Sequence, residues 1–314
     1  KKKEPPKQDT TEVSEMEAVN RRIKATPDDA DLYHKRAELH MENARINKAL
    51  SDINTAIEKG GRKADYIITL SDIYFAMGQV TKTEQALQSV LIEDNDHLDA
   101  LLKMAQLHLY RGNHNQAFSF LNRALSFAPG DERIYFISGM INKDKGDTDK
   151  AIRDFHRATE QDQEFYDAFI QLGIIAAEQD DSLAVLYYEN ALDARPESQE
   201  ALYNLGFFYQ DQERYEKAID TYNRLLDVNP QNINAYYNLG YINLTVMENY
   251  QKAEEYFSRV LDIDPQNVNA VYNLGYALEL QGDIEEARKH YRQTLEMEEN
   301  FRLGIQGLNR LDQK

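Results

Sequence analysis

The chain contains no cysteine among its 314 residues. Disulfide bonds, thiolate metal sites and thiol nucleophiles are therefore excluded together. The compartment stays open, because a chain without cysteine is compatible with an oxidising or a reducing environment. Long apolar runs are missing as well. None approaches the roughly 18 uninterrupted residues that a membrane helix needs, so we expect no transmembrane segment.

Basic residues are in short supply, with 36 Lys and Arg against 54 Asp and Glu and a formal net charge of -18. Nucleic-acid binding draws on clustered cations that neutralise phosphates, so this balance predicts no nucleic-acid partner. A hydrophobic content of 42% is enough to bury a core. Residues 1–10 (KKKEPPKQDT) differ, because they carry four lysines and two adjacent prolines without periodicity, and we expect a disordered arm there.

An internal repeat organises the rest of the sequence. The string YNLGFFY at 203–209 returns as YNLGYIN at 237–243 and as YNLGYAL at 272–278, at offsets of 34 and 35 residues. The prolines beyond the arm recur at a constant distance before each next copy. Counting from these marks predicts eight repeats, at 30–63, 64–97, 98–131, 132–165, 166–198, 199–232, 233–267 and 268–301.

Each repeat has the pattern of two helices joined by a turn. In the sixth repeat, Leu202, Leu205 and Tyr209 recur at helical spacing, and a second apolar stripe follows the turn. Five repeats have Gly at position 8 and seven have Ala at position 20, so we expect small residues of the two helices to face each other. Further glycines fall at the turn itself, where positive φ is expected; they are Gly78, Gly112, Gly146 and Gly282.

The combination of a 34-residue period, Leu-Gly at positions 7 and 8, Ala at 20, an aromatic at 24 and Pro at 32 resembles the tetratricopeptide repeat (TPR) family over residues 30–301. The resemblance implies an all-α fold, a right-handed superhelical TPR solenoid of eight helix-turn-helix repeats. It also implies a non-catalytic scaffold or adaptor, since the family uses this fold for many protein partners.

The ends and the first two repeats depart from the pattern. Residues 11–29 and 302–314 are expected as capping helices that shield the end faces of the array. In the last helix Ile305, Leu308 and Leu311 are expected to face inward, and Gln306, Asn309 and Arg310 outward. Arg36 replaces the usual Leu at position 7, and Gly60–Gly61 replaces a proline linker, so we expect less secure packing there.

The resemblance places positions 2, 5, 6, 9, 12 and 13 of the first helices in a concave groove. Position 6 in the last four repeats reads Gln171, Asn204, Asn238 and Asn273. Amides carry donors and an acceptor, so a ladder of them can pair with an extended peptide backbone without reading its sequence. The alternative is that Asn at this position is common in the family and only supports the local helix.

Aromatic residues accompany these amides. Position 5 carries Tyr203, Tyr237 and Tyr272, and position 9 carries Phe207, Tyr241 and Tyr276. Upstream the same register is mostly apolar, with Ile68, Phe75, Leu102, Leu109, Tyr110, Phe136, Ile137, Met140, Ile170 and Ile174. A continuous apolar lining needs a cover, which is a partner segment, the chain's own arm or a second copy. We favour the protein segment, basic or apolar in character, and keep self-association open.

Two other ligand classes can be compared with this interpretation. A glycan or small ligand stacked on Tyr203, Tyr237, Tyr241, Tyr272 and Tyr276 is the alternative from a different class. The clamp that related cochaperones use for acidic chaperone tails is improbable. The positions that match its two lysines and its arginine read Glu200, Asn269 and Asn273, so no cation is present to hold a carboxylate.

Catalytic and metal-binding motifs are absent from the sequence, and we expect no cofactor. There is no HExxH, GxSxG or helix-opening GxGxxG, and no two of the seven histidines stand four residues apart. His40 and His108 fall in the core register and are expected to be buried. The charged leader resembles the mature start of bacterial envelope TPR lipoproteins, which favours a periplasmic location over a cytoplasmic one. The sequence encoded before Lys1 would decide this.

Overall fold

The computed structural model describes residues 10–313, which form 18 α-helices and no strand. The predicted all-α class is therefore confirmed for the described residues. The arm expected at 1–10 falls on residues 1–9, outside the described part, apart from Thr10, which begins the first helix. None of the described helices is long and apolar enough to cross a bilayer.

The helices form two compact units that divide between Gln161 and Asp162, here called the N-terminal and the C-terminal unit. The N-terminal unit contains α1 (Thr10–Ala25), α2 (Ala30–Glu42), α3 (Ile46–Gly60), α4 (Ala64–Ala76), α5 (Val80–Glu93), α6 (Leu98–Tyr110), α7 (His114–Phe127), α8 (Glu132–Asp144) and α9 (Thr148–Gln161). The C-terminal unit contains α10 (Tyr166–Glu178), α11 (Leu183–Ala194), α12 (Gln199–Asp211), α13 (Tyr215–Val228), α14 (Ile233–Thr245), α15 (Tyr250–Ile263), α16 (Val268–Gln281), α17 (Ile284–Met297) and α18 (Arg302–Asp312).

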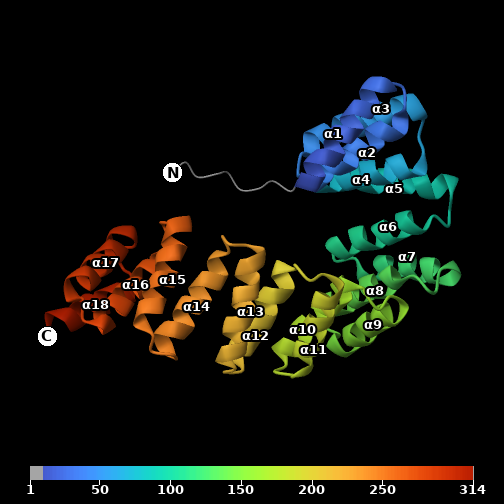
Figure 1. The fold of residues 1–314 in the computed structure, drawn as a ribbon. Helices are drawn as coiled ribbons and strands as arrows, with labels where there is room; N and C mark the ends of the chain where they lie inside the picture. Colours follow the sequence, from blue (N-terminus) through green and yellow to red (C-terminus); the bar gives the residue numbers. More distant parts are fainter. Residues whose placement is uncertain (1–9, 314) are drawn as a thin grey trace. The chain divides into compact units, whose positions relative to one another are not determined.

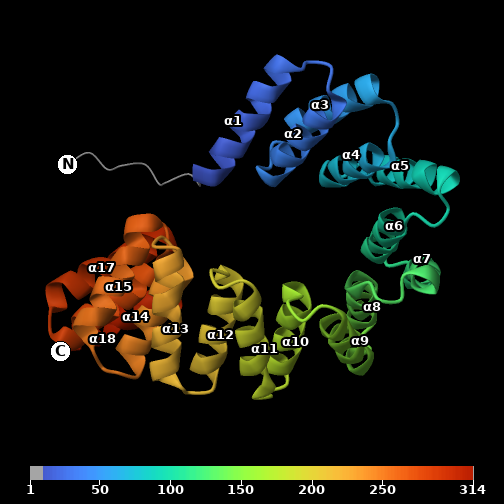
Figure 2. The same cartoon turned by 45° about the vertical axis from the view of Figure 1, so that its right-hand side comes forward.

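Both units are built from helix pairs. The two helices of each pair, such as α10 with α11 or α16 with α17, make the most extensive contacts, and the second helix then packs on the first helix of the next pair. Figure 1 shows the pairs of the C-terminal unit side by side in chain order. The first helices of successive pairs also contact one another. For example, α10 contacts α12 and α14 contacts α16, so these helices form one face of the array. Figure 2 turns this row of pairs to a second view.

The glycines at position 8 accommodate aromatic rings. A Cβ built on Gly206 would lie 2.8 Å from the Tyr222 ring, and one on Gly173 would lie 2.5 Å from the Tyr188 ring. The alanines at position 20 are fully buried. The glycines at position 8 were expected to face these small residues, but each lies against an aromatic ring at position 24. The glycine makes room for the large side chain at position 24, so the ring fills the space between the paired helices.

The turn inside each pair contains a residue in the left-handed region. Four of these are the predicted glycines, with φ from 69° at Gly78 to 89° at Gly282. The other four repeats use Ala44, Asp180, Glu213 and Glu248, with φ between 50° and 55°. A side chain costs energy in this conformation, so the turn geometry is imposed by the helix pair rather than by glycine.

The first repeats compensate for their unusual residues. The Arg36 guanidinium donates to both carboxylate oxygens of the buried Asp52 at 2.7 Å and to Asn20 at 2.9 Å. Asn20 belongs to α1, so this arginine ties the first helix to the α2–α3 pair. Gly61 ends α3 at a φ of 79°. The expected loss of packing at position 7 is therefore replaced by a paired charge.

The last helix, α18, covers the end of the array with Leu308 and Leu311 inward and Gln306 and Asn309 outward, as expected, but Ile305 and Arg310 differ from the expectation. Gly304 and Gly307 are buried and lie against Thr294 and Tyr291, whereas Ile305 is exposed. Leu311 is buried as predicted. Arg310, expected to face outward, instead donates to Glu279 at 2.8 Å. Two close glycine contacts bring α18 near α17, and this rotates the arginine toward α16.

Candidate partner-binding site

The four amides at position 6 lie in different surroundings. Asn273 is buried, and its Nδ2 donates to the Tyr237 hydroxyl at 3.0 Å. Asn238 is half-buried and donates to the Tyr222 hydroxyl at 3.0 Å, while Asn204 is half-buried beside a hollow. Gln171 is half-buried and also has an interaction partner. The amides therefore do not form one uniform row of free groups, and Asn204 is the member that borders open space.

The aromatic residues at positions 5 and 9 divide in a regular way. Phe207 is 50% exposed and Tyr241 is 44% exposed on the first-helix face. Tyr203, Tyr237 and Tyr276 are half-buried. On α12 and α16 the rings at positions 5 and 9 stack along the helix, with centroids 6.3 Å apart for Tyr203 and Phe207 and 6.2 Å apart for Tyr272 and Tyr276.

Tyr272 departs from this arrangement because the end of the array covers it. It is 9% exposed and packs against Tyr291 at 5.6 Å and Phe301 at 5.8 Å between ring centroids. Phe301 immediately precedes α18, so the capping helix closes this part of the face. Tyr272 and its neighbour Asn273 thus support the surface from below.

The apolar register predicted upstream is only partly on the surface. Phe75 and Tyr110 are exposed, and their rings meet edge to face at 5.2 Å. Leu102, Ile137 and Ile170 are buried in the core, so the expectation of a continuous apolar lining was wrong at these positions. These three side chains fill the contacts between neighbouring helices.

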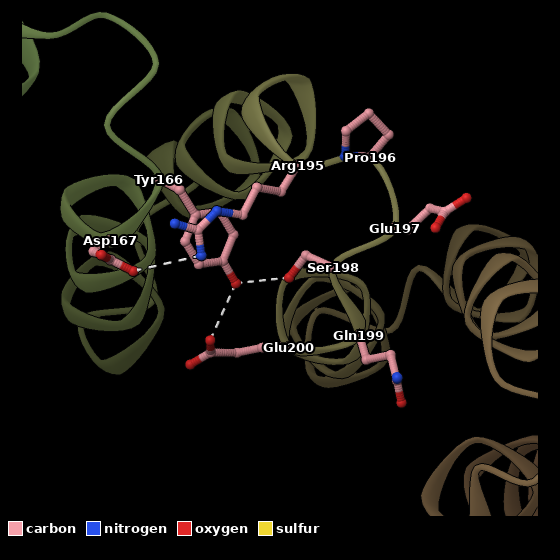
Figure 3. A pocket seen from close by; sticks show the side chains of 8 residues that line it. All are labelled: Tyr166, Asp167, Arg195, Pro196, Glu197, Ser198, Gln199 and Glu200. Atoms are coloured by element: carbon pink, nitrogen blue, oxygen red, sulfur yellow. Dashed lines mark hydrogen bonds and ion pairs between the residues drawn. The ribbon is translucent and has the colours of Figure 1, made fainter. Parts of the chain in front are cut away.

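A hollow of about 740 Å³ in the C-terminal unit lies at the loop between α11 and α12. Figure 3 shows Tyr166 at its centre, with the ring beneath Arg195 and the hydroxyl between Ser198 and Glu200. Ser198 caps α12 by accepting from the Ala201 N–H at 3.1 Å, and Ser198 and Tyr166 share a hydrogen bond of 2.6 Å. Tyr166 in turn donates to Glu200 at 3.1 Å. These polar groups satisfy one another, so the hollow is best explained as a structural junction between two repeats.

A smaller hollow of about 260 Å³ lies on the first-helix face, between α10 and α12. Its lining includes Asn204 and Phe207, together with Glu178, Tyr188 and Asp211, which the sequence analysis did not single out. A sequence signal did exist for Tyr188. Position 12 is Gln210 or Glu279 in repeats that carry a tyrosine in the same place, but Ala177 here.

Burial sets the protonation of the tyrosines beneath the face. It raises the pKa of the Tyr222 and Tyr237 hydroxyls above the usual value, while the bonds from Asn238 and Asn273 act in the opposite direction. Both phenols therefore stay protonated and keep a hydrogen to donate. The Tyr222 hydroxyl uses it on Gln210 at 3.1 Å.

The buried histidines follow the prediction. His40 and His108 both lie in the core, and burial lowers the pKa of each imidazole. His108 stacks on Phe120 with ring centroids 5.4 Å apart. Among the described residues, no three His, Asp or Glu side chains gather into a group that could hold a metal ion.

Comparison with known families agrees with the repeat geometry. Sequence models of the tetratricopeptide repeat match residues 68–135, 132–165, 197–266 and 231–300, together more than half of the chain. The chain belongs to the tetratricopeptide-repeat family. TPR proteins are typically non-catalytic, and the repeats support a general role of this chain as a protein-interaction scaffold.

Individual relatives are more distant. Residues of this TPR chain are 28% identical over 114 positions to the Protein CTR9 homolog of Arabidopsis thaliana, which is 36% of this chain and 10% of that protein. The chain thus spans about a tenth of this relative. The C-terminal part of a TPR protein from Cytophaga hutchinsonii has a TM-score of 0.65 at 17% identity and covers 77% of this chain and 99% of its own. The Cut9–Hcn1 hetero-tetramer of the APC/C has a TM-score of 0.57 at 20% identity, covering 85% and 53%. These likenesses establish a shared fold.

Proposed function

We propose that the C-terminal unit binds a segment of another protein along its first-helix face, as a non-catalytic adaptor. The observation that carries the proposal is the pair of exposed rings, Phe207 at 50% and Tyr241 at 44%, on the successive first helices α12 and α14. Half-buried Tyr203 and Tyr237 lie beside them. Large aromatic side chains that stay half in water are the kind of contact that protein interfaces use as anchors.

The amides supply orientation in this proposal. Asn204 and Asn238 are half-buried, and the carbonyl oxygen of Asn238 can accept a backbone N–H from a bound segment while its Nδ2 stays on Tyr222. One such bond contributes about 0.5–1.5 kcal/mol net, so the aromatic contacts supply most of the affinity. Asn273 acts indirectly in this scheme, by holding Tyr237 in place.

The alternative occupants fit the face less well. A glycan needs open aromatic platforms, but Tyr272 is buried and Tyr276 stacks on it at 6.2 Å. A second copy of the chain would bring another strongly acidic surface to this one, because the net charge is -18. A foreign segment of neutral or basic character avoids both difficulties. The Cut9–Hcn1 assembly offers a precedent in fold for a TPR chain that holds another protein.

The test begins with site-specific photo-crosslinking. A benzophenone amino acid placed at Tyr241 should crosslink to a partner in cells, and the crosslinked peptide identifies the bound segment. The control places the same amino acid at Leu186, which is at least as exposed but lies on the second helix α11. Crosslinking to the same peptide from both positions would contradict a specific first-helix face.

Affinity then measures the energetic role of the two rings. Phe207→Ser with Tyr241→Ser should weaken binding of the identified segment by at least about tenfold in calorimetry, since each half-exposed ring contributes roughly 1–2 kcal/mol. The matched control is Leu183→Ser with Leu186→Ser, which removes similar exposed apolar area from α11. Equal affinity of the two double variants would refute the proposal.

A further inference from the structure

The small hollow between α10 and α12 has an apolar wall and a polar rim. Ile174, Ala177 and Phe207 form the wall, and the carboxylates of Glu178 and Asp211 lie at the rim. Both acids are exposed, and neither forms an ion pair with any residue from 15 to 313. The mouth of the hollow therefore carries two uncompensated negative charges above an apolar floor.

The floor contains a tyrosine whose hydroxyl has no hydrogen-bond partner in the described part of the chain. Tyr188 is 2% exposed and lines the hollow. Its counterparts in two later repeats are fully satisfied. Tyr222 donates to Gln210 at 3.1 Å and accepts from Asn238 at 3.0 Å.

The comparison with the last repeat gives the same result. Tyr291 donates to Glu279 at 2.7 Å and accepts from Arg310 at 3.2 Å. The position of Gln210 and Glu279 is taken by Ala177 beside Tyr188, and the short alanine side chain leaves both the hollow and the hydroxyl open. The Tyr188 hydroxyl has no bond to a protein group among the described residues and is open to the hollow, so the site is suited to a polar group that comes from outside.

The charge of the surroundings decides which polar group fits. Burial and the nearby carboxylate of Glu178 raise the pKa of Tyr188, so the phenol stays neutral and offers its oxygen as an acceptor. Asn204 adds an amide oxygen on the same wall. The hollow thus presents acceptors at two depths and a negative mouth, which is complementary to a cation with several donors.

We propose that this hollow receives the side chain of an arginine from the bound protein segment, and the inference rests on the proposed function. The planar guanidinium has five N–H donors for Glu178, Asp211, Asn204 and Tyr188, and its flat face can stack on Phe207. The methylene stem lies against the apolar wall. Lysine fits less well, because its compact ammonium cannot reach acceptors at both depths and stays strongly hydrated.

The direct test uses N-acetyl-arginine methylamide as the probe, with the full chain labelled at Ile and Ala methyl groups for NMR. The signals of Ile174 and Ala177 should shift saturably, with a dissociation constant of about 1 mM. The neutral isostere N-acetyl-citrulline methylamide should bind at least tenfold more weakly. Absent shifts, or equal binding of citrulline, would overturn the inference.

Variants separate the hollow from general attraction to an acidic protein. Ala177→Gln copies the residue that satisfies Tyr222 and should fill the hollow and abolish the shifts. Should that variant fold poorly, Glu178→Gln with Asp211→Asn must lower the affinity at least tenfold. The charge-matched control is Glu216→Gln with Asp220→Asn on the exposed side of α13, and it must leave the affinity for the arginine amide unchanged.

The outcome is distinguishable from that of the proposed function. A segment that crosslinks at Tyr241 but binds Ala177→Gln with unchanged affinity overturns the arginine site and leaves the proposed function standing. An arginine amide that binds in the hollow, with no segment crosslinked at Tyr241, supports the site and overturns the proposed function.

Discussion

The ion pair that holds the last helix allows a quantitative test of how the array ends. Glu279 of α16 has a side chain only 4% exposed, and it accepts from Tyr291 at 2.7 Å and from Arg310 of α18 at 2.8 Å. Arg310→Ala would leave the carboxylate buried without its guanidinium partner. The perturbation therefore removes a direct ion pair from a nearly buried carboxylate.

The expected magnitude follows from burial and distance. Coulomb attraction at 2.8 Å is about 6 kcal/mol at an effective dielectric constant of about 20, and desolvation of the two charges offsets much of it. Breaking a buried pair costs about 3–5 kcal/mol. The Arg310 side chain is 40% exposed, so water can enter the vacated space, and we expect a loss of about 2–3 kcal/mol.

Hydrogen exchange is the appropriate assay, because the ends of a repeat array unfold without the rest. Amides of α18 in Arg310→Ala should exchange roughly 30- to 150-fold faster than in the unaltered chain, while those of α12 should not change. Glu279→Gln combined with Arg310→Met, which leaves no buried charge, should recover most of the protection.

A matched control is a more exposed pair that also involves α18. Arg288 of α17 bonds to Asp312 of α18, whose side chain is 63% exposed, so Asp312→Asn should cost no more than about 1 kcal/mol. Equal protection of α18 in Arg310→Ala and in the unaltered chain would refute the reasoning.

Three further predictions concern stability, measured by urea unfolding. Gly206→Ala drives a Cβ to 2.8 Å from Tyr222 and should cost about 1–3 kcal/mol, whereas Gly130→Ala, with nothing nearer than 3.7 Å, should change stability by less than about 0.5 kcal/mol; equal losses would contradict the packing argument. Glu213→Gly relieves a φ of 55° and should add about 0.5–1 kcal/mol; a loss would show that the turn is unstrained. Burial lowers the pKa of His108 despite the opposing charge of Glu84, so its contribution is complete above the unfolded pKa of about 6.5 and is lost as the pH falls toward the folded value. His108→Leu should therefore reduce the drop in stability between about pH 7.5 and about pH 5, and an unchanged drop would argue against this assignment.

The sequence was sufficient for the fold because the repeat period, the apolar stripes and the turn glycines all report local structure. The left-handed turn residue was predicted at the four turn glycines, but not where Ala44, Asp180, Glu213 or Glu248 takes that place. The burial of Tyr272 could not be predicted, because it depends on Phe301 and α18, which come after the last repeat. The eight-repeat boundaries and the two capping segments agree with the helix order but stay predictions as domain limits.

The candidate site was harder to predict than the fold, because it depends on contacts between residues that are distant in the sequence. Register alone placed Asn204, Asn238 and Asn273 on one face, yet their availability depends on which phenols lie beneath them. The hollow beside Tyr188 arises from one alanine in a neighbouring helix, so only a comparison of position 12 between repeats could have pointed to it. The envelope location predicted from the leader involves residues 1–9, outside the described part of the chain.

Several phenols connect the interior of the C-terminal unit with its surface. The rings of Tyr188 and Tyr222 pack against glycines inside a repeat, while their oxygens reach the hollow or the amide of Asn238. The chain has 20 tyrosines and no tryptophan, so no indole masks their emission. A ligand that binds at these hydroxyl oxygens should change the fluorescence of the buried tyrosines. Occupancy can thus be followed optically in the unlabelled protein.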